Sequence, residues 1–145
     1  MLDDLYQEVI LDHSKRPRNF HDMADATRRA EGYNPLCGDK LALFVKMDGD
    51  KVQDVSFIGA GCAISTASAS LMTETVKGKS REEAVHLMER FHDLLTTEKP
   101  RKADLGKLEV FSGVREFPAR VKCATLAWHT FHNAVEEGQV TVKSP

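Results

Sequence analysis

Alternating apolar residues on either side of a single Asp-Gly turn constrain the fold of this chain more than any other feature. Apolar side chains occupy every second position from Leu41 to Met47, and after Asp48-Gly49-Asp50 the segment 51–58 is again rich in Val, Phe and Ile. This pattern predicts an antiparallel hairpin. A weaker strand pattern precedes it at 27–33. The sequence therefore predicts a small, largely antiparallel sheet of three strands.

The predicted hairpin brings together two cysteines that lie far apart in the sequence. If the turn centres on Gly49, Cys37 lies opposite a residue within about two positions of Cys62. Both segments leave the same end of the hairpin, so a slip of one or two residues in register leaves this proximity intact. We expect the two thiols to meet at one end of the sheet.

Helical patterns fill most of the remaining sequence. Apolar spacing predicts a first helix that ends near Lys15-Arg16-Pro17, and the small residues after Cys62 fit a second. Ser80 and Glu83 form a capping box for a third helix, and Pro118 can begin the last one. We predict an α+β fold, with an N-terminal helix and a C-terminal helical layer around the sheet. The expected buried stripe of the last helix consists of Val121, Ala124, Trp128, Phe131 and Val135.

Length and composition indicate one domain in a reducing compartment. A chain of 145 residues can fold without disulfides, and we expect a single domain over 1–145 with a flexible polar tail at 138–145. Three cysteines cannot all pair, and there is no leader pattern or long apolar run, so we expect a cytoplasmic protein without a membrane partner. The net charge of -2 gives no field that would attract nucleic acid, which we do not expect as a partner.

The three cysteines are the candidate chemical groups. Cys37 lies in a predicted loop, Cys62 in the first turn of a predicted helix, and Cys123 near the start of the last predicted helix. Unpaired N–H groups and the positive end of a helix dipole favour a thiolate at a helix start. Thiolates bind zinc and iron and attack sulfur electrophiles. Together with Asp39, the three thiols would complete a tetrahedral site of three sulfurs and one oxygen.

Each candidate also has a plain structural interpretation. Isolated cysteines are often small buried hydrophobic residues, and a carboxylate after Gly38 is ordinary turn chemistry for Asp39. The pattern of the last helix leaves Cys123 on a flank of the buried stripe, so its approach to the other thiols stays open. Arg120 and Lys122 would activate a thiol or steer an anionic persulfide, with a solvated helix face as the alternative.

Three ordered motifs carry a resemblance to a known family. They are NPLCGD at 34–39, GAGCAISTASAS at 59–70 and FPARVKCATLAW at 117–128. From Leu5 to Trp128 the chain resembles the IscU/NifU-like family of iron–sulfur cluster assembly proteins and, within it, the SufU branch. The classic scaffold proteins carry a histidine directly before the last cysteine, where this chain has Lys122. The extra segment between the capped helix and Cys123 is likewise SufU-like.

The resemblance implies a ligand set, a cofactor and partners. It implies a zinc ion bound by Cys37, Asp39, Cys62 and Cys123. It also implies a cysteine desulfurase that supplies persulfide sulfur, and downstream iron–sulfur acceptor or scaffold proteins. We expect Cys37, on a loop beside Gly38, to be the catalytic sulfur acceptor, because a free thiolate attacks a persulfide as it attacks a disulfide.

Three functions stay open at this point. The first is a zinc-bound sulfur acceptor, in effect a sulfurtransferase that works with the desulfurase. The second is a scaffold that assembles a transient [2Fe–2S] cluster on the same ligands, with iron in place of zinc. The third is a structural zinc domain that binds partners.

Overall fold

A computed structural model gives the fold, and the structure describes residues 2–35, 38–96, 105–137 and 139–143. In chain order, the helices and strands are α1 (Leu2–Lys15), β1 (Arg28–Asn34), β2 (Asp39–Asp48), β3 (Lys51–Ala60), α2 (Ala63–Val76), α3 (Arg81–Thr96), the 3₁₀ helix η1 (Gly106–Glu116), α4 (Pro118–Glu137) and β4 (Gln139–Lys143). None of the described helices has the length and apolar character needed to cross a bilayer. The predicted α+β fold, with an antiparallel three-stranded unit and an N-terminal helix, is confirmed.

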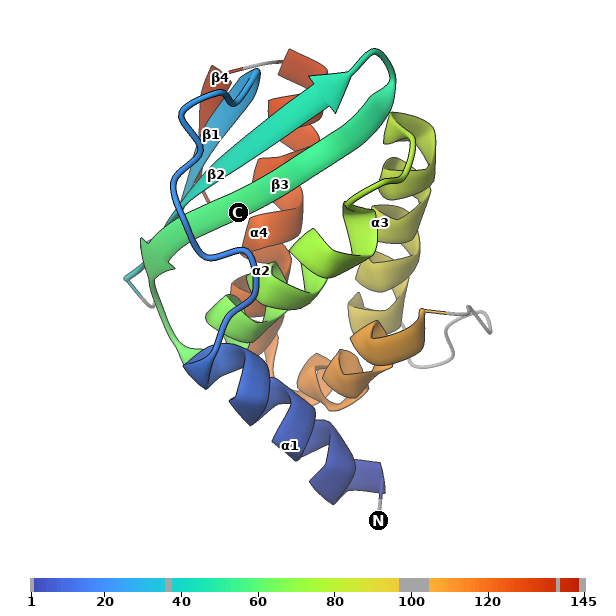
Figure 1. Ribbon diagram of the computed structural model, residues 1–145. Coiled ribbons are helices and arrows are strands. Elements are labelled where there is room, and N and C mark those ends of the chain that lie inside the picture. Colours follow the sequence, from blue (N-terminus) through green and yellow to red (C-terminus); the bar gives the residue numbers. More distant parts are fainter. Residues whose placement is uncertain (1, 36–37, 97–104, 138, 144–145) are drawn as a thin grey trace.

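The strands form one sheet in the order β3-β2-β1-β4, with α2 and α4 against one of its faces (Figure 1). β2 and β3 make the predicted hairpin, from Asp48 opposite Lys51 to Lys40 opposite Ala60. An irregularity between Lys46 and Met47 moves the pairing one residue beyond the predicted register. Asp39 at the start of β2 and Ala60 at the end of β3 therefore lie at the same end of the hairpin, whereas Cys37, one of the two cysteines of the prediction, lies outside the described residues.

The segment that the sequence predicts as a flexible tail, 138–145, contains a strand. β4 pairs in parallel with β1 and extends the antiparallel unit by a fourth strand. Val140 and Val142 alternate with polar residues, which is a strand pattern. Only five residues carry that pattern, and a segment this short shows its strand character mainly through pairing with a neighbour.

A buried aromatic cluster joins α4 to α3 and η1. The ring of Trp128 stacks on Phe91 of α3, with 4.9 Å between the ring centroids. Phe111 of η1 meets Phe91 edge-on, with 5.7 Å between the centroids. All three side chains are fully buried, and large buried aromatic residues contribute strongly to packing. This packing holds the helix that carries Cys123.

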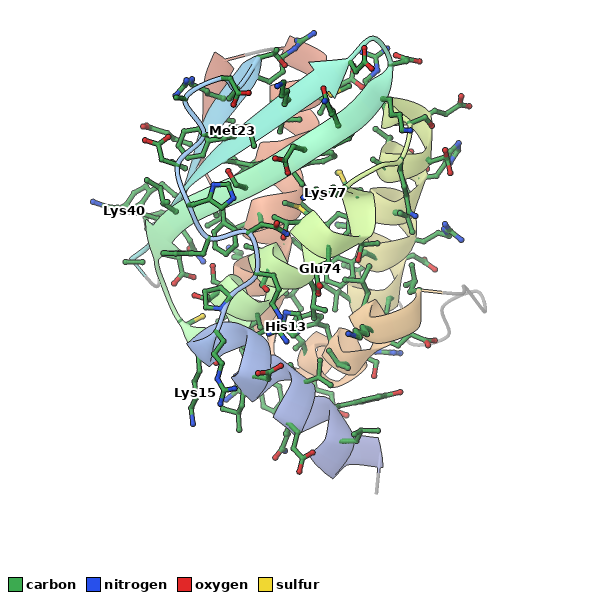
Figure 2. All side chains as sticks on the ribbon, in the orientation of Figure 1. His13, Lys15, Met23, Lys40, Glu74 and Lys77 are labelled. Carbon is green, nitrogen blue, oxygen red and sulfur yellow. The ribbon has the colours of Figure 1, made fainter. Side chains whose placement is uncertain are left out.

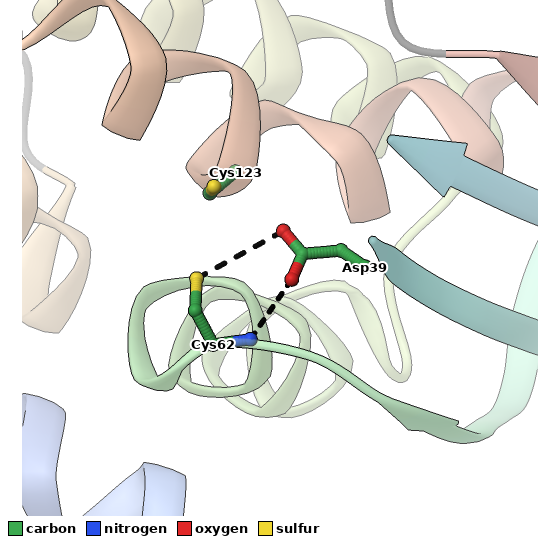
Figure 3. A group of neighbouring side chains, drawn as sticks. All are labelled: Asp39, Cys62 and Cys123. Carbon is green, nitrogen blue, oxygen red and sulfur yellow. Dashed lines mark hydrogen bonds between the residues drawn. The ribbon is translucent and has the colours of Figure 1, made fainter. Parts of the chain in front are cut away.

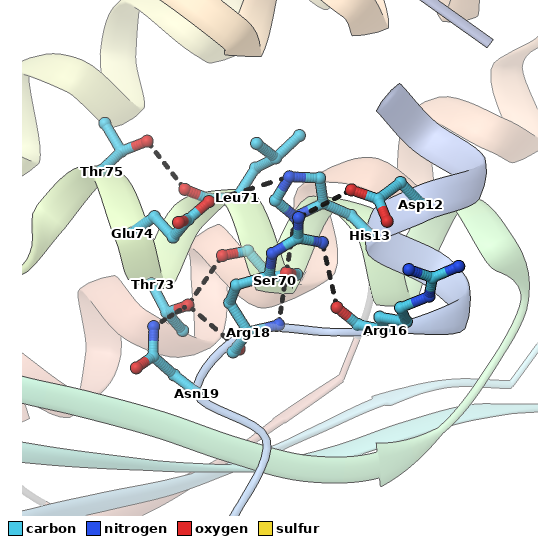
Figure 4. Close-up of polar contacts among 10 residues, drawn as sticks. All are labelled: Asp12, His13, Arg16, Arg18, Asn19, Ser70, Leu71, Thr73, Glu74 and Thr75. Atoms are coloured by element: carbon cyan, nitrogen blue, oxygen red, sulfur yellow. Dashed lines mark hydrogen bonds and ion pairs between the residues drawn. The ribbon is translucent and has the colours of Figure 1, made fainter. Parts of the chain in front are cut away.

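A polar cluster binds the end of α1 to α2 (Figure 4). His13 is buried, and its Nδ1 lies 2.7 Å from the hydroxyl oxygen of Ser70, which also accepts the N–H of Arg18 at 2.8 Å. The Asn19 amide donates to the Thr73 hydroxyl at 3.0 Å. Figure 2 shows His13 beside Glu74 of α2, with 3.7 Å between His13 Nε2 and Glu74 Oε1. These contacts hold α1 on the helix that follows Cys62.

The buried His13 predicts a loss of stability in mild acid. Burial and the nearby Arg18 cation lower the pKa of His13 from its usual value of 6.5. Unfolded chains then bind more protons than folded ones below about pH 6.5, so stability is lost as the pH falls from there toward the folded pKa. We expect a loss of up to about 1.4 kcal/mol per pH unit.

Urea unfolding at about pH 7.5 and about pH 5.5 measures this effect in the wild type and in His13→Gln. His129 also has a lowered pKa, through burial and the neighbouring His92 and His132, and it contributes in the same direction. It is common to both proteins, so the difference between them reports His13. An equal pH dependence in the two proteins would contradict the expectation.

Candidate metal centre

Asp39 begins β2 and points toward the start of α2 (Figure 3). Its carboxylate is buried, and its Oδ1 accepts the backbone N–H of Cys62 at 2.9 Å. The other oxygen, Oδ2, lies 3.8 Å from the Cys62 sulfur. The sequence leaves two roles open for Asp39, a metal ligand or a turn cap. One carboxylate oxygen is thus held by the backbone, while the other faces a thiol.

Cys62 is the N-cap residue of α2, one position before the predicted first turn. Its sulfur accepts the N–H of Ser65 at 3.4 Å, and the side chain is exposed. A side chain at this position satisfies one of the free N–H groups of the helix start. The hairpin register and the helix cap together fix where the Cys62 sulfur lies relative to Asp39.

Gly61 makes room for the Asp39 carboxylate. A Cβ atom at position 61 would lie 2.8 Å from Asp39 Oδ1 and 3.3 Å from its Cγ. Real side chains do not tolerate the first of these distances, so the carboxylate would have to move. The sequence pattern alone does not predict this role, although a glycine directly before a candidate ligand is a signal of close backbone approach.

We expect Gly61→Ala to destabilise the metal-free protein by about 1–3 kcal/mol, the usual cost of overpacking. Gly113→Ala is the matched control, because no atom lies within 4 Å of a Cβ built there. That variant should stay within about 0.5 kcal/mol of the wild type. Urea unfolding in the presence of a chelator measures both variants. Equal unfolding midpoints for the two would show that Gly61 has no packing role.

Cys123 completes the described part of the site from α4. Its side chain is buried, and its sulfur accepts a hydrogen bond from the Asn34 amide at 3.8 Å. The predicted flank position thus lies inside the protein, covered by the end of β1. The sulfurs of Cys62 and Cys123 and a carboxylate oxygen of Asp39 all lie within 4.8 Å of one another. The approach of Cys123, which the sequence left open, is therefore present in the structure.

Cys37, the fourth predicted ligand and the predicted catalytic residue, lies outside the described residues. The residues on either side of it are described. Asn34 is paired with Asp39 across β1 and β2, and its carbonyl accepts the N–H of Gly38 at 2.8 Å. Gly38 has a φ of 72°, which favours glycine. Asn34 and Gly38, two of the described residues nearest Cys37, therefore lie beside Asp39.

The three described residues of the site differ in exposure. Asp39 and Cys123 are buried, whereas Cys62 is exposed. Arg120 is exposed near the start of α4, the helix that also carries Cys123. Its guanidinium lies 4.5 Å from the centre of the ring of Phe117, which is also exposed. Two sulfurs and one oxygen are donors that zinc and iron accept. Among the described residues, this is the one group of at least three potential ligand side chains this close together.

Known proteins are similar to this chain in sequence and in fold. Residues 5–137 match the family model described as the NifU-like N-terminal domain. The chain is 46% identical over 136 residues to the iron–sulfur cluster assembly scaffold protein IscU of Streptococcus pyogenes serotype M1, covering 93% of this chain and 85% of that protein. It is 46% identical over 140 residues to the zinc-dependent sulfurtransferase SufU of Bacillus subtilis strain 168, covering 94% of this chain and 95% of that protein.

Solved structures agree with these sequence matches. A protein from Fervidobacterium islandicum AW-1, proposed as an iron–sulfur cluster assembly scaffold for the SUF system, aligns with a TM-score of 0.84 at 37% identity. The alignment covers 89% of this chain and 95% of that structure. A crystal structure of a protein without an assigned function aligns with a TM-score of 0.85 at 43% identity, over 93% of this chain and 99% of that one.

Proposed function

This chain belongs to the NifU-like N-terminal domain family, and from that premise we propose that it is an iron–sulfur cluster assembly protein that binds zinc and accepts sulfur from a cysteine desulfurase. One observation carries the proposal. A carboxylate and two thiols from β2, the start of α2 and α4 converge within 4.8 Å, at the end of the sheet where the Cys37 loop begins and ends.

The described donors fit a zinc ion. Zinc–sulfur bonds of about 2.3 Å in a tetrahedron place neighbouring ligand atoms about 3.8 Å apart. Asp39 Oδ2 and the Cys62 sulfur lie at 3.8 Å, and no pair in the group exceeds 4.8 Å. Cys37, two residues before Asp39, would supply the fourth ligand. Bound zinc would keep the thiolates deprotonated near neutral pH without undergoing a redox change of its own.

Sulfur acceptance would follow ordinary thiolate chemistry at Cys37. Its thiolate attacks the outer sulfur of the persulfide on the desulfurase, and a new sulfur–sulfur bond forms. The sulfur–sulfur bond of the donor breaks, and the desulfurase cysteine leaves as a thiolate. Cys37 then carries the persulfide for a downstream acceptor protein. No external oxidant or reductant is needed, because one sulfur–sulfur bond replaces another.

A second candidate function is a scaffold that builds a transient [2Fe–2S] cluster on the same residues. The Streptococcus pyogenes relative, named as a scaffold, is as similar to this chain as the Bacillus subtilis sulfurtransferase. A carboxylate ligand such as Asp39 binds iron less strongly than a thiolate and would favour release of the cluster. Lys122, in place of the histidine of the classic scaffold proteins, favours the first function.

One pair of measurements separates the two functions. Zinc analysis of the purified protein, followed by incubation with a cysteine desulfurase and cysteine, should give one zinc per chain and a persulfide on this protein. Anaerobic incubation with iron and sulfide should give no stable colour while zinc is retained. A coloured cluster that forms and moves to an acceptor protein would support the scaffold function instead.

A further inference from the structure

Asn34 connects the elements that carry the candidate ligands. It is the last residue of β1, and its side chain is 1% exposed. It pairs with Asp39 across the sheet, and its carbonyl accepts the N–H of Gly38. A single buried residue therefore contacts both Asp39 at the start of β2 and Gly38 directly before it.

The Asn34 side chain reaches a third element. Its Nδ2 donates to the Cys123 sulfur on α4, with 3.8 Å between nitrogen and sulfur. A metal-bound thiolate carries no proton and can only accept a hydrogen bond, so the amide N–H is the part of Asn34 suited to it. A bond from an N–H group to an anionic sulfur is charge-assisted, and burial strengthens it further.

We propose that Asn34 is a positioning residue for the metal centre: its amide orients Cys123 and draws charge from the sulfur, while its backbone carbonyl holds the N–H of Gly38 beside Asp39. The proposal rests on the proposed metal site. Removing a group that hydrogen-bonds to a metal ligand commonly weakens metal binding by about 10- to 100-fold. We expect a loss of metal affinity in the same range for Asn34.

The test uses Asn34→Leu, which has a similar branched shape but no N–H donor, and Asn34→Ala as a second variant. Cobalt(II) serves as the probe, because it occupies zinc sites and reports thiolate bonding by charge-transfer absorption. Thr125→Val is the matched control. Thr125 is also buried on α4 near Cys123, but its hydroxyl donates to the carbonyl of Val121 at 2.9 Å.

We expect both Asn34 variants to bind cobalt about 10–100-fold more weakly than the wild type in a chelator competition. Their sulfur-to-cobalt charge-transfer band should move to lower energy. A thiolate that has lost its hydrogen bond transfers electron density to the metal more easily. A merely structural role would not move this band. Thr125→Val should keep the wild-type band and bind within about twofold of the wild type.

Unchanged affinity and absorption in both Asn34 variants would overturn the inference while leaving the metal site intact. Equal effects in Thr125→Val, or unfolding of both Asn34 variants with and without cobalt, would also overturn it, since each indicates general packing. If the wild type binds no cobalt, the proposed function fails as well. The wild-type titration therefore distinguishes the two failures.

Discussion

A cysteine desulfurase is expected to work no faster with the Cys37→Ala variant present than it does alone. In the proposed reaction the Cys37 thiolate is the atom that attacks the persulfide, and an alanine side chain offers no nucleophile. The fold should survive, because a backbone hydrogen bond from Gly38 to Asn34 joins the described residues on either side of position 37. The measurements are the desulfurase rate and the mass of the acceptor, which should gain one sulfur in the wild type only.

Two further variants keep this result interpretable. Cys62→Ala and Cys123→Ala each remove a candidate ligand, at the N-cap of α2 or on α4, and both should lower zinc content. If all three cysteine variants lower the melting temperature equally, the structural zinc domain becomes the better explanation. Full stimulation by Cys37→Ala would rule out Cys37 as the sulfur acceptor.

The hairpin explains why part of the site could be predicted from the sequence. A two-residue period and an Asp-Gly turn set a register, and a register places residues that are more than twenty positions apart. The hydrogen bond from the Cys62 N–H to Asp39 follows from that register almost directly. The one-residue irregularity at Lys46 did not matter, because it left both candidate groups at the same end of the sheet.

Cys123, the third described candidate ligand, shows what a local pattern leaves out. The helical spacing correctly identified the buried stripe around Trp128, but it placed Cys123 on a flank. Whether a flank is buried depends on which element covers it, and here Asn34 at the end of β1 does so. This contact joins residues 89 positions apart in the sequence. The hydrophobic period of a single helix cannot predict it.

The roles of Gly61 and Asn34 cannot be predicted from the sequence for a related reason. Both residues lie inside the cysteine motifs, but neither offers a ligand atom that zinc prefers. Their roles depend on space and hydrogen bonding: Gly61 leaves room for a carboxylate, and Asn34 donates to a sulfur. Such supporting residues become visible only once the ligands have been placed in three dimensions.

The second large expected effect concerns Asp39 and the stability that zinc confers. Zinc at about 1,000 times its Kd should stabilise the wild type by about 4 kcal/mol. In a chain of this length each kcal/mol raises Tm by about 2–4 °C, so zinc should raise the wild-type Tm by roughly 8–16 °C. This gain should be lost on adding a chelator.

Asp39→Asn should remove most of that gain without harming the metal-free fold. An asparagine carbonyl can still accept the Cys62 N–H, but the anionic oxygen facing the Cys62 sulfur is gone. If affinity falls by about a hundredfold, the same zinc concentration stabilises by only about 1.4 kcal/mol. The zinc-dependent rise in Tm should then shrink to roughly 3–6 °C.

Asp25→Asn provides the matched control for this substitution. Asp25 is an exposed carboxylate that forms an ion pair with Lys46 at 2.7 Å, and such surface pairs contribute little stability. This variant should therefore show the full wild-type response to zinc, because its lost charge lies outside the site. If Asp39→Asn retains that full response too, then Asp39 only caps the turn, and the metal must be held by the cysteines alone.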